Sequence, residues 1–264
     1  MQKIVIHAGF HKTATTTVQR FLGANRDALR PMAKVVLAFQ LRHATAAAHV
    51  MSNAPSAAHL ADFRSAFEDV LRVMPRDRNI ILSSEDLIGR VPGRVPGDAY
   101  PQAEHLAKAM MMSISRVFSD ECEATLILSR RAPEDWIESV WWQNLRSTRM
   151  TLSHAAFRES MGSGDPQQGV VDRMQAHLGA ARVQDYDIER TASIPGGAAW
   201  PLLHMIDIPD AIIRDLTPVS PQNRRTVQGL EDVFLALNRS DLSKAGVMNA
   251  KTLILRSARR QAPE

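Results

Sequence analysis

Residues 3–22 read KIVIHAGFHKTATTTVQRFL, and they join an apolar run to a helical pattern through a turn that contains one glycine. The run over residues 3–8 is typical of a strand buried on both faces of a parallel sheet. Residues 15–25 carry helical periodicity through apolar positions such as Val18 and Phe21. A strand, a turn and a helix in this order open a βαβ unit. The segment therefore predicts an α/β fold.

Later apolar runs predict further strands at residues 79–83 and 124–128, with a weaker one at 181–185. Helical patterns alternate with these runs, at residues 57–73, 100–118 and 133–146. Such alternation favours a three-layer α/β/α fold around a central parallel sheet. From about residue 198 onward the pattern is helical, so we expect a helical C-terminal third.

The composition is that of a folded protein with one large domain. The chain has 264 residues, of which 45% are apolar and 23% charged; these values are ordinary for a globular protein of this size. We expect a single domain over residues 1–264. Within it we expect an α/β core over residues 1–190 and a mainly helical segment over residues 198–258.

Charge and cysteine content narrow the function classes. The chain has 32 Lys and Arg against 28 Asp and Glu, a net charge of +4. This small surplus suits a locally bound anionic small ligand better than nucleic acid. The single cysteine, Cys122, permits neither an intramolecular disulfide nor a zinc site built on several thiolates. With no signal-peptide pattern and no apolar run of about 18 residues, we expect a cytoplasmic protein.

The turn at residues 7–17 has the features of an anion site. A strand-to-helix turn exposes backbone N–H groups at a helix N-terminus, where the helix dipole also favours negative charge. Lys12 adds a cation, and nearby threonines offer hydroxyl groups. The alternative is a helix capped by threonine beside a surface lysine. The turn is not a Walker A motif, because His11 stands where that motif has glycine.

The pattern His7-x-Gly9-x-x-Lys12-Thr13-x-Thr15-Thr16 resembles the 5′-phosphosulfate loop of the sulfotransferase superfamily, especially its bacterial branch. The resemblance implies a P-loop NTPase-like fold that binds 3′-phosphoadenosine 5′-phosphosulfate (PAPS). It also implies that Lys12 contacts the departing bridging oxygen. The binding residues implied in the loop are Gly9, Phe10, His11, Lys12, Thr13, Ala14, Thr15 and Thr16. Most relatives carry glycine at the position of Ala14, and we expect the methyl group to be tolerated if the backbone there is helical.

A second anchor is predicted where the run at residues 124–128 ends. An arginine at a strand's carboxyl end, such as Arg131, points to where open α/β sheets bind ligands, and its planar group can hold a phosphate with two hydrogen bonds. The alternative is a surface ion pair with Glu134 or Asp135. The resemblance implies that Arg131 and Ser139 form the family's 3′-phosphate motif, which also holds the product 3′-phosphoadenosine 5′-phosphate (PAP).

Glu85, at the end of the run at residues 79–83, is our candidate for the general base. Sulfuryl transfer to a hydroxyl benefits from a group that accepts the acceptor's proton, and His11 is the second choice. The alternative is that Glu85 caps a helix or pairs with Arg90. Because the sulfuryl group moves in line, positioning and charge neutralisation should dominate, and we expect no metal requirement.

The acceptor is left open as a hydroxyl or amine of a carbohydrate, a lipid or a small molecule. Its specificity is expected from the connections at residues 33–75, 90–100 and 147–169. Arg224 or Arg225 is a candidate to close over the nucleotide. The rival interpretations are a nucleotide kinase-like phosphotransferase and a catalytically silent nucleotide-binding protein of the same fold.

Overall fold

The described residues form a central sheet of five parallel strands. The computed structural model describes residues 1–93, 99–119, 121–220 and 229–261. The strands lie in the order β2-β3-β1-β4-β5, and every neighbouring pair is parallel. Their bounds are β1 Gln2–His7, β2 Ala33–Leu37, β3 Asn79–Ser83, β4 Cys122–Arg130 and β5 Val183–Asp187. The predicted α/β class with a parallel sheet is confirmed.

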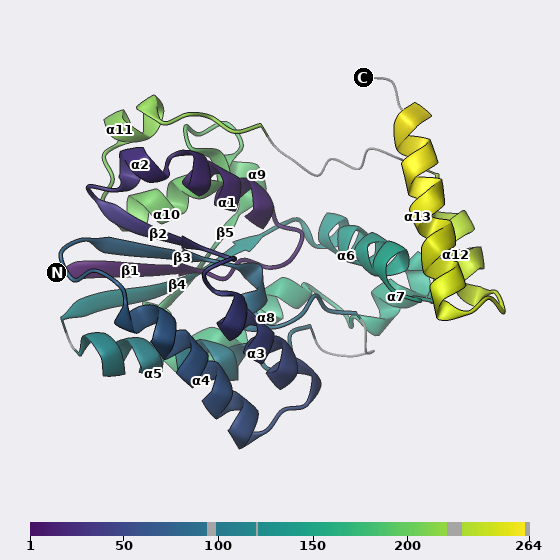
Figure 1. Cartoon of the computed structure of the whole chain (residues 1–264), viewed down its shortest axis with the longest axis horizontal. Coiled ribbons are helices and arrows are strands. Elements are labelled where there is room, and N and C mark those ends of the chain that lie inside the picture. Colours follow the sequence, from purple (N-terminus) through teal and green to yellow (C-terminus); the bar gives the residue numbers. More distant parts are fainter. Residues whose placement is uncertain (94–98, 120, 221–228, 262–264) are drawn as a thin grey trace.

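Helices cover both faces of this sheet, which gives three layers (Figure 1). One face carries α1 (Thr15–Ala24), α2 (Arg26–Leu29), α10 (Trp200–Met205) and α11 (Asp210–Asp215). The other face carries α3 (Arg42–Asn53), α4 (Ala57–Arg72), α5 (Ala103–Phe118) and α8 (Pro166–Leu178). Short turns of helix are η1 (Glu85–Ile88), α9 (Ile188–Thr191) and η2 (Gly197–Ala199).

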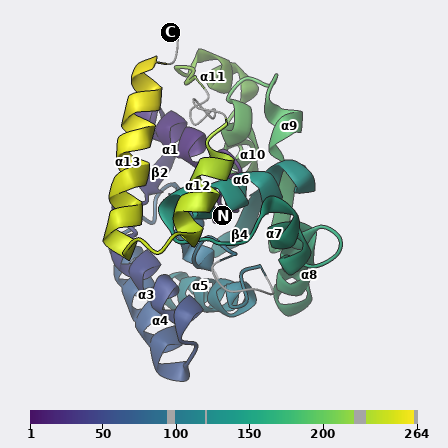
Figure 2. The same ribbon diagram turned by 90° about the vertical axis from the view of Figure 1, so that its right-hand side faces the viewer.

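A further group of helices lies beyond the carboxyl ends of the strands, as Figure 1 shows. Its members are α6 (Pro133–Ser147), α7 (His154–Ser160), α12 (Glu231–Arg239) and α13 (Lys244–Gln261). Figure 2 views the protein from this end, with α12 and α13 nearest the viewer. The C-terminal third is helical where it is described, as the sequence predicted.

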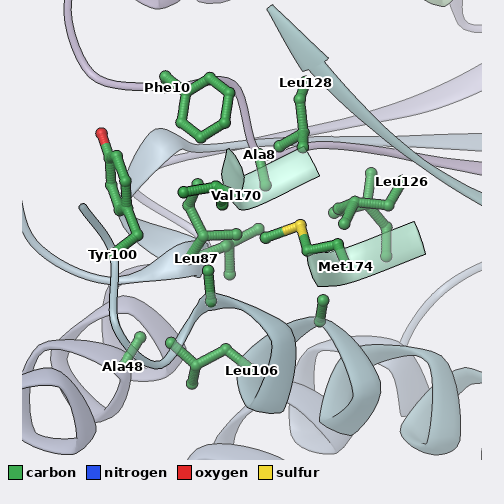
Figure 3. Close-up of a cluster of buried hydrophobic side chains, with 14 of the residues drawn as sticks. Ala8, Phe10, Ala48, Leu87, Tyr100, Leu106, Leu126, Leu128, Val170 and Met174 are labelled. Carbon is green, nitrogen blue, oxygen red and sulfur yellow. The ribbon is translucent and has the colours of Figure 1, made fainter. Parts of the chain in front are cut away.

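Strand alternation divides the core into two clusters. Ile4 and Ile6 of β1 are fully buried in the cluster under α3, α4, α5 and α8, whereas Val5 joins the cluster under α1 and α10. Successive strand residues point to opposite faces, so an apolar run covered on both sides buries every position. Figure 3 shows part of the first cluster, where Leu126 and Leu128 of β4 meet helical side chains.

Most predicted elements agree with the structure, and the differences concern β2 and β5. Residues 33–37 form edge strand β2, whereas the sequence placed them in a connection expected to set acceptor specificity. The weak strand predicted at residues 181–185 is β5, two residues later. A strand of five residues is stabilised mainly by the strand it pairs with. Its short apolar run cannot be distinguished by periodicity from a buried turn of helix.

Buried polar contacts attach the C-terminal helices to α6. The ammonium of Lys251 donates to the carbonyl oxygens of Leu145 and Thr148, both at 2.6 Å, at the carboxyl end of α6. Asn238 of α12 donates to Leu145 and Met150. Burial lowers the pKa of Lys251 to about 8, and the nearby charge of Arg149 acts in the same direction. Arg224 and Arg225 lie outside the described residues.

Candidate functional site

The candidate site lies at the carboxyl ends of β1, β3 and β4. From β1 the chain continues toward β2 on one side of the sheet, and from β4 it continues to β5 on the other side. Open parallel sheets bind ligands where neighbouring strands diverge in this way. The β1–α1 loop (residues 8–14), η1 after β3 and α6 after β4 all begin at this edge.

The β1–α1 loop presents consecutive backbone N–H groups. Lys12 and Ala14 have positive φ angles of 71° and 62°, with Thr13 between them. Alternation of left-handed and ordinary residues curves the chain so that successive N–H groups converge, which is the geometry of an anion-binding nest. The N–H groups of residues 12–16 donate no hydrogen bond to another described residue. The loop can therefore offer them to an anion.

Gly9 allows this loop to pass close to β4. A methyl group at Gly9 would lie 2.1 Å from Oγ of Ser129 and 2.7 Å from Nε2 of His7. His7 is fully buried, and its Nδ1 and Nε2 bond the hydroxyls of Ser83 (2.9 Å) and Ser129 (3.3 Å). Three strands are thus joined beneath the loop. Burial lowers the pKa of His7 to about 3, so the ring is neutral.

The hydroxyl of Thr13, which the sequence offered for helix capping or for an oxyanion, is engaged within the protein. Thr13 is fully buried, and its Oγ1 bonds the carbonyl oxygen of Phe10 at 2.5 Å and Oγ of Ser129 at 2.7 Å. The hydroxyl therefore holds the loop closed, and only the backbone N–H remains for a ligand. Thr15 is also buried, whereas Thr16 is exposed at the start of α1.

Ala14 occupies the N-cap position of α1 in the left-handed conformation, with φ 62° and ψ 17°. The condition under which its methyl group was expected to be tolerated, a helical backbone, is therefore not met. The alternative of a threonine-capped helix is also wrong, because the cap is Ala14, which has no side-chain cap. The left-handed region costs an L-residue with a Cβ about 1–2 kcal/mol, which glycine avoids.

We expect Ala14→Gly to raise the free energy of unfolding by about 1 kcal/mol, because relief of this strain exceeds the added entropy of the unfolded chain. Urea denaturation measures the change. Ala46→Gly, at an exposed position inside α3, is the matched control and should lower stability by about 1 kcal/mol. A loss of stability in both variants would contradict the strain at Ala14.

Lys12 lies among like charges. Burial, followed by the guanidinium groups of Arg146 and then Arg131, lowers the pKa of the Lys12 ammonium, while Glu85 acts in the opposite direction. No hydrogen bond or ion pair joins this ammonium to another described residue. Lys12 thus lies near two further cations, with Glu85 as the opposing charge that acts on it, and a bound anion would stabilise this arrangement. Arg146 was not identified from the sequence, because its spacing from Arg131 matched no motif that we used.

Arg130 and Arg131 are consecutive but differ in their surroundings. Arg130 is 16% exposed and donates at 3.0 Å to both Asp165 and Asp185. Arg131 is 34% exposed, and its nearest carboxylates, on Asp135 and Glu189, lie at 3.6 and 4.0 Å. The predicted alternative of a pair with Asp135 is therefore present but loose. Arg131 can exchange these partners for a ligand, whereas Arg130 is held by strong contacts.

One face of α6 carries the other polar residues of the site. Ser139, Gln143 and Arg146 are four and three residues apart, which places them on one side of a helix. Oε1 of Gln143 accepts from Nε (3.2 Å) and Nη2 (2.5 Å) of Arg146. Trp136, buried on the helix, donates from Nε1 to the carbonyl oxygen of His11 at 2.8 Å and so joins α6 to the loop.

Glu85 lies beside Lys12 and contacts α1. It begins η1, and its Oε2 accepts a hydrogen bond from Nε2 of Gln19 at 2.7 Å. Neither the helix cap nor the pair with Arg90 that the sequence left open occurs among the described contacts of Glu85. Its charge influences Lys12 electrostatically, so the two side chains share one site.

His11 is engaged at both ring nitrogens. Nδ1 bonds the hydroxyl of Tyr100 at 2.9 Å, and Nε2 bonds Oδ1 of Asp86 at 3.1 Å. Asp86 also accepts from Nε2 of His49 at 2.8 Å. Tyr100, Asp86 and His49 were not identified from the sequence, since 37 to 89 residues separate these partners and spacing carried no signal.

Two cavities in the described part of the protein lie away from this site. One, of about 440 Å³, lies between edge strand β2 and α4, with Val36, Asp69 and Val73 in its wall. The other, of about 150 Å³, is lined by Lys3, Glu123 and other residues near the amino ends of β1 and β4. Neither cavity is lined by a residue of the β1–α1 loop, so we place the site by the N–H groups of that loop and by the charges around Lys12.

Two further observations complete the description. No helix in the described ranges is long and apolar enough to cross a lipid bilayer. Comparison of the sequence with protein-family models gave no match, and comparison with curated proteins found no relative.

Proposed function

We propose that this protein binds PAPS and transfers its sulfuryl group to a hydroxyl or amine of an acceptor. The observation that carries the proposal is the β1–α1 loop, whose N–H groups at residues 12–16 are free of described partners and lie beside Lys12. Backbone donors at a helix N-terminus together with a lysine suit a phosphate or sulfate group. The resemblance of the loop sequence to sulfotransferases selects the donor.

The cations around the loop suit a nucleotide with two separate anionic groups. Lys12 and the loop N–H groups would hold the 5′-phosphosulfate. Arg131, with Ser139 on the following helix, would hold the 3′-phosphate. Asp135 and Glu189 near Arg131 are 57% and 48% exposed, so they can turn toward solvent when a phosphate arrives. Arg146 adds positive charge to the same region.

The chemistry assigned to the chain is placement of charge and acceptance of one proton. When bound, PAPS supplies the sulfuryl group; its bond to the bridging oxygen breaks as a bond to the acceptor oxygen forms. Lys12 stabilises the negative charge left on the nucleotide. The acceptor's proton passes to a base, and Glu85 is favoured over His11 because both nitrogens of His11 are already bonded.

A nucleotide kinase is less well supported by the loop. In P-loop kinases the hydroxyl after the loop lysine binds Mg²⁺. The residue after Lys12 is Thr13, and its buried hydroxyl is bonded to Phe10 and Ser129. The hydroxyl at this position therefore stabilises the loop, in contrast to the Mg²⁺-binding hydroxyl of P-loop kinases.

Thermal-shift and calorimetric titration with PAP, run beside ADP and ATP with Mg²⁺, tests the proposal. PAP at 100 times its dissociation constant should add about 2.7 kcal/mol of stability. Arg131→Ala should weaken PAP binding by about 1.5–3 kcal/mol, the range for a hydrogen bond to a charged group. Arg158→Ala, which removes an exposed arginine paired with Glu134, is the matched control.

Stabilisation by ATP and Mg²⁺ but not by PAP would move the protein to the phosphotransferases. PAP binding at full strength in Arg131→Ala would remove Arg131 from the 3′-phosphate site and leave the loop assignment standing.

A further inference from the structure

His11 is fixed at four points by residues from three other parts of the chain. Its backbone N–H donates to the hydroxyl of Tyr100 at 2.9 Å, and its carbonyl accepts from Trp136 at 2.8 Å. Its ring bonds Tyr100 and Asp86 and stacks on Tyr100, with ring centroids 5.8 Å apart. Both the backbone and the side chain of His11 are therefore restrained, and the next residue is Lys12.

Asp86 joins His11 to α3. Oδ1 of Asp86 accepts from Nε2 of His11 at 3.1 Å and from Nε2 of His49, on α3, at 2.8 Å. Burial acts to raise the pKa of the Asp86 carboxyl, but the hydrogen bonds and charges of the two rings hold the pKa well below its ordinary value. An ionised carboxylate only accepts hydrogen bonds, so both rings carry their proton on Nε2.

Tyr100 completes the arrangement from the opposite side. Burial raises the pKa of its phenol well above the ordinary value, so the hydroxyl keeps its proton. It accepts the N–H of His11 and, when that ring is neutral, donates to Nδ1. Figure 3 shows the Tyr100 ring against the apolar cluster near Phe10, with its hydroxyl directed away from Leu106.

The backbone is strained at two positions that follow His11. Lys12 and Ala14 both have left-handed backbones, and such residues persist only where the surroundings determine their conformation. Gly9 is the one glycine of the loop, and neither of the two strained residues is a glycine. The N–H groups of residues 12–16 converge only while this strained geometry lasts.

We propose that Asp86 and His49 are positioning residues that, through His11, hold Lys12 and the following N–H groups in their anion-binding conformation. Asp86 touches neither the anion site nor a reacting atom in this scheme. The inference deepens the proposed function and rests on it for the identity of the ligand. The expected effect on the loop of the ligand-free protein does not depend on the proposed function.

The direction in which Asp86→Ala changes the affinity for PAP distinguishes a positioning role of Asp86 from a purely electrostatic one. Asp86 is a carboxylate near an anion site, so charge alone predicts that Asp86→Ala binds PAP more tightly. Loss of positioning predicts weaker binding, by about tenfold, because charge-assisted hydrogen bonds are lost. Asp69→Ala is the matched control, since Asp69 pairs with Arg72 on the surface of α4. Calorimetric titration with PAP measures all three proteins.

Two rescue variants sharpen the result. In His49→Gln the amide can place an N–H donor near the position of Nε2, so PAP affinity should stay within about twofold, whereas His49→Leu should weaken it several-fold. Ala14→Gly adopts the left-handed backbone without strain, so it should restore at least about threefold of the affinity lost in Asp86→Ala. A purely electrostatic effect of Asp86 would not be restored in this way.

Hydrogen exchange in the free protein tests the positioning without any ligand. The amides of His11, Thr17 and Val18 are hydrogen bonded within or beside the loop. They should exchange about tenfold faster in Asp86→Ala, while the strands keep their protection. Unchanged exchange, or tighter PAP binding, in Asp86→Ala would overturn the inference. Failure of the unmodified protein to bind PAP would instead contradict the proposed function, and the exchange result would still decide the role of Asp86.

Discussion

Lys12→Ala should lower turnover of the sulfuryl donor by roughly 10²–10³-fold, the usual effect of removing one donor to a developing oxyanion. Lys12 is the ammonium closest in sequence to the free N–H groups of the loop, and the charge of Glu85 acts on it. Conversion of PAPS to PAP, measured with an acceptor found by screening hydroxyl compounds, gives the rate. Lys34→Ala, at an exposed lysine of β2, is the matched control.

The same variant should not lose stability. The guanidinium groups of Arg146 and Arg131 lower the pKa of Lys12, so removal of its charge relieves repulsion in the ligand-free protein. Alanine at this position keeps the left-handed backbone cost unchanged, because both residues carry a Cβ. We expect an unchanged or slightly raised melting temperature. A variant with normal turnover, or one that loses activity only because it unfolds, would contradict the role given to Lys12.

Acidification should destabilise the protein through His7. The folded pKa of this buried ring is lowered to about 3, whereas the unfolded value is about 6.5. Between these values the unfolded chain binds a proton that the folded protein excludes, so stability falls as the pH falls. The slope is about 1.4 kcal/mol per pH unit, and the full loss is on the order of 5 kcal/mol near pH 3.

Urea denaturation at pH 7 and pH 5 measures this effect. The unmodified protein should lose about 2 kcal/mol from His7 over this interval. His7→Asn can keep the bond to Ser83 but loses the one to Ser129, so it should be about 2 kcal/mol less stable at pH 7. Its stability should then change less with pH. An equal change in both proteins would show that His7 is not the group responsible.

The lowered pKa of Asp86 affects stability in a lower range of pH than His7 does. Its folded pKa lies below the ordinary value of 3.8, so its contribution to stability is present above that value and is lost as the pH falls further. The loss of stability due to His7 begins at higher pH than the loss due to Asp86. The contributions of the two residues to stability can therefore be separated by their pH ranges.

Residues that follow the strands could be placed from the sequence because the chain itself sets their position. The continuous apolar runs of β1, β3 and β4 predict a parallel sheet, and Lys12, Glu85 and Arg131 follow those runs directly. In a parallel sheet the carboxyl ends of all strands meet at one edge. Local pattern was therefore sufficient to bring these residues to the same region.

Edge strand β2 was not recognised, and the pattern alone gave no role to Arg130, the residue before Arg131. Residues 33–37 form a strand because β3 pairs with them, and a five-residue apolar run does not indicate from the sequence which strand it will pair with. Asp165 and Asp185 bind Arg130 from α8 and β5, which leaves Arg131 for the site. Both outcomes depend on segments that meet only in the folded protein.

The sequence by itself determined the α/β class, the strand-to-helix turn after β1 and which side chains stand at the strand ends, because these follow from periodicity and from neighbours along the chain. The tertiary structure alone decided how the turn is held. Asp86 and Tyr100 bond His11 from distant positions, His49 bonds Asp86, and the hydroxyl of Thr13 is bonded within the loop. The left-handed backbone at Ala14 has no glycine to signal it. The hydrogen bonds that fix His11, three residues before it, are long-range, and such bonds have no spacing that a sequence pattern can reveal.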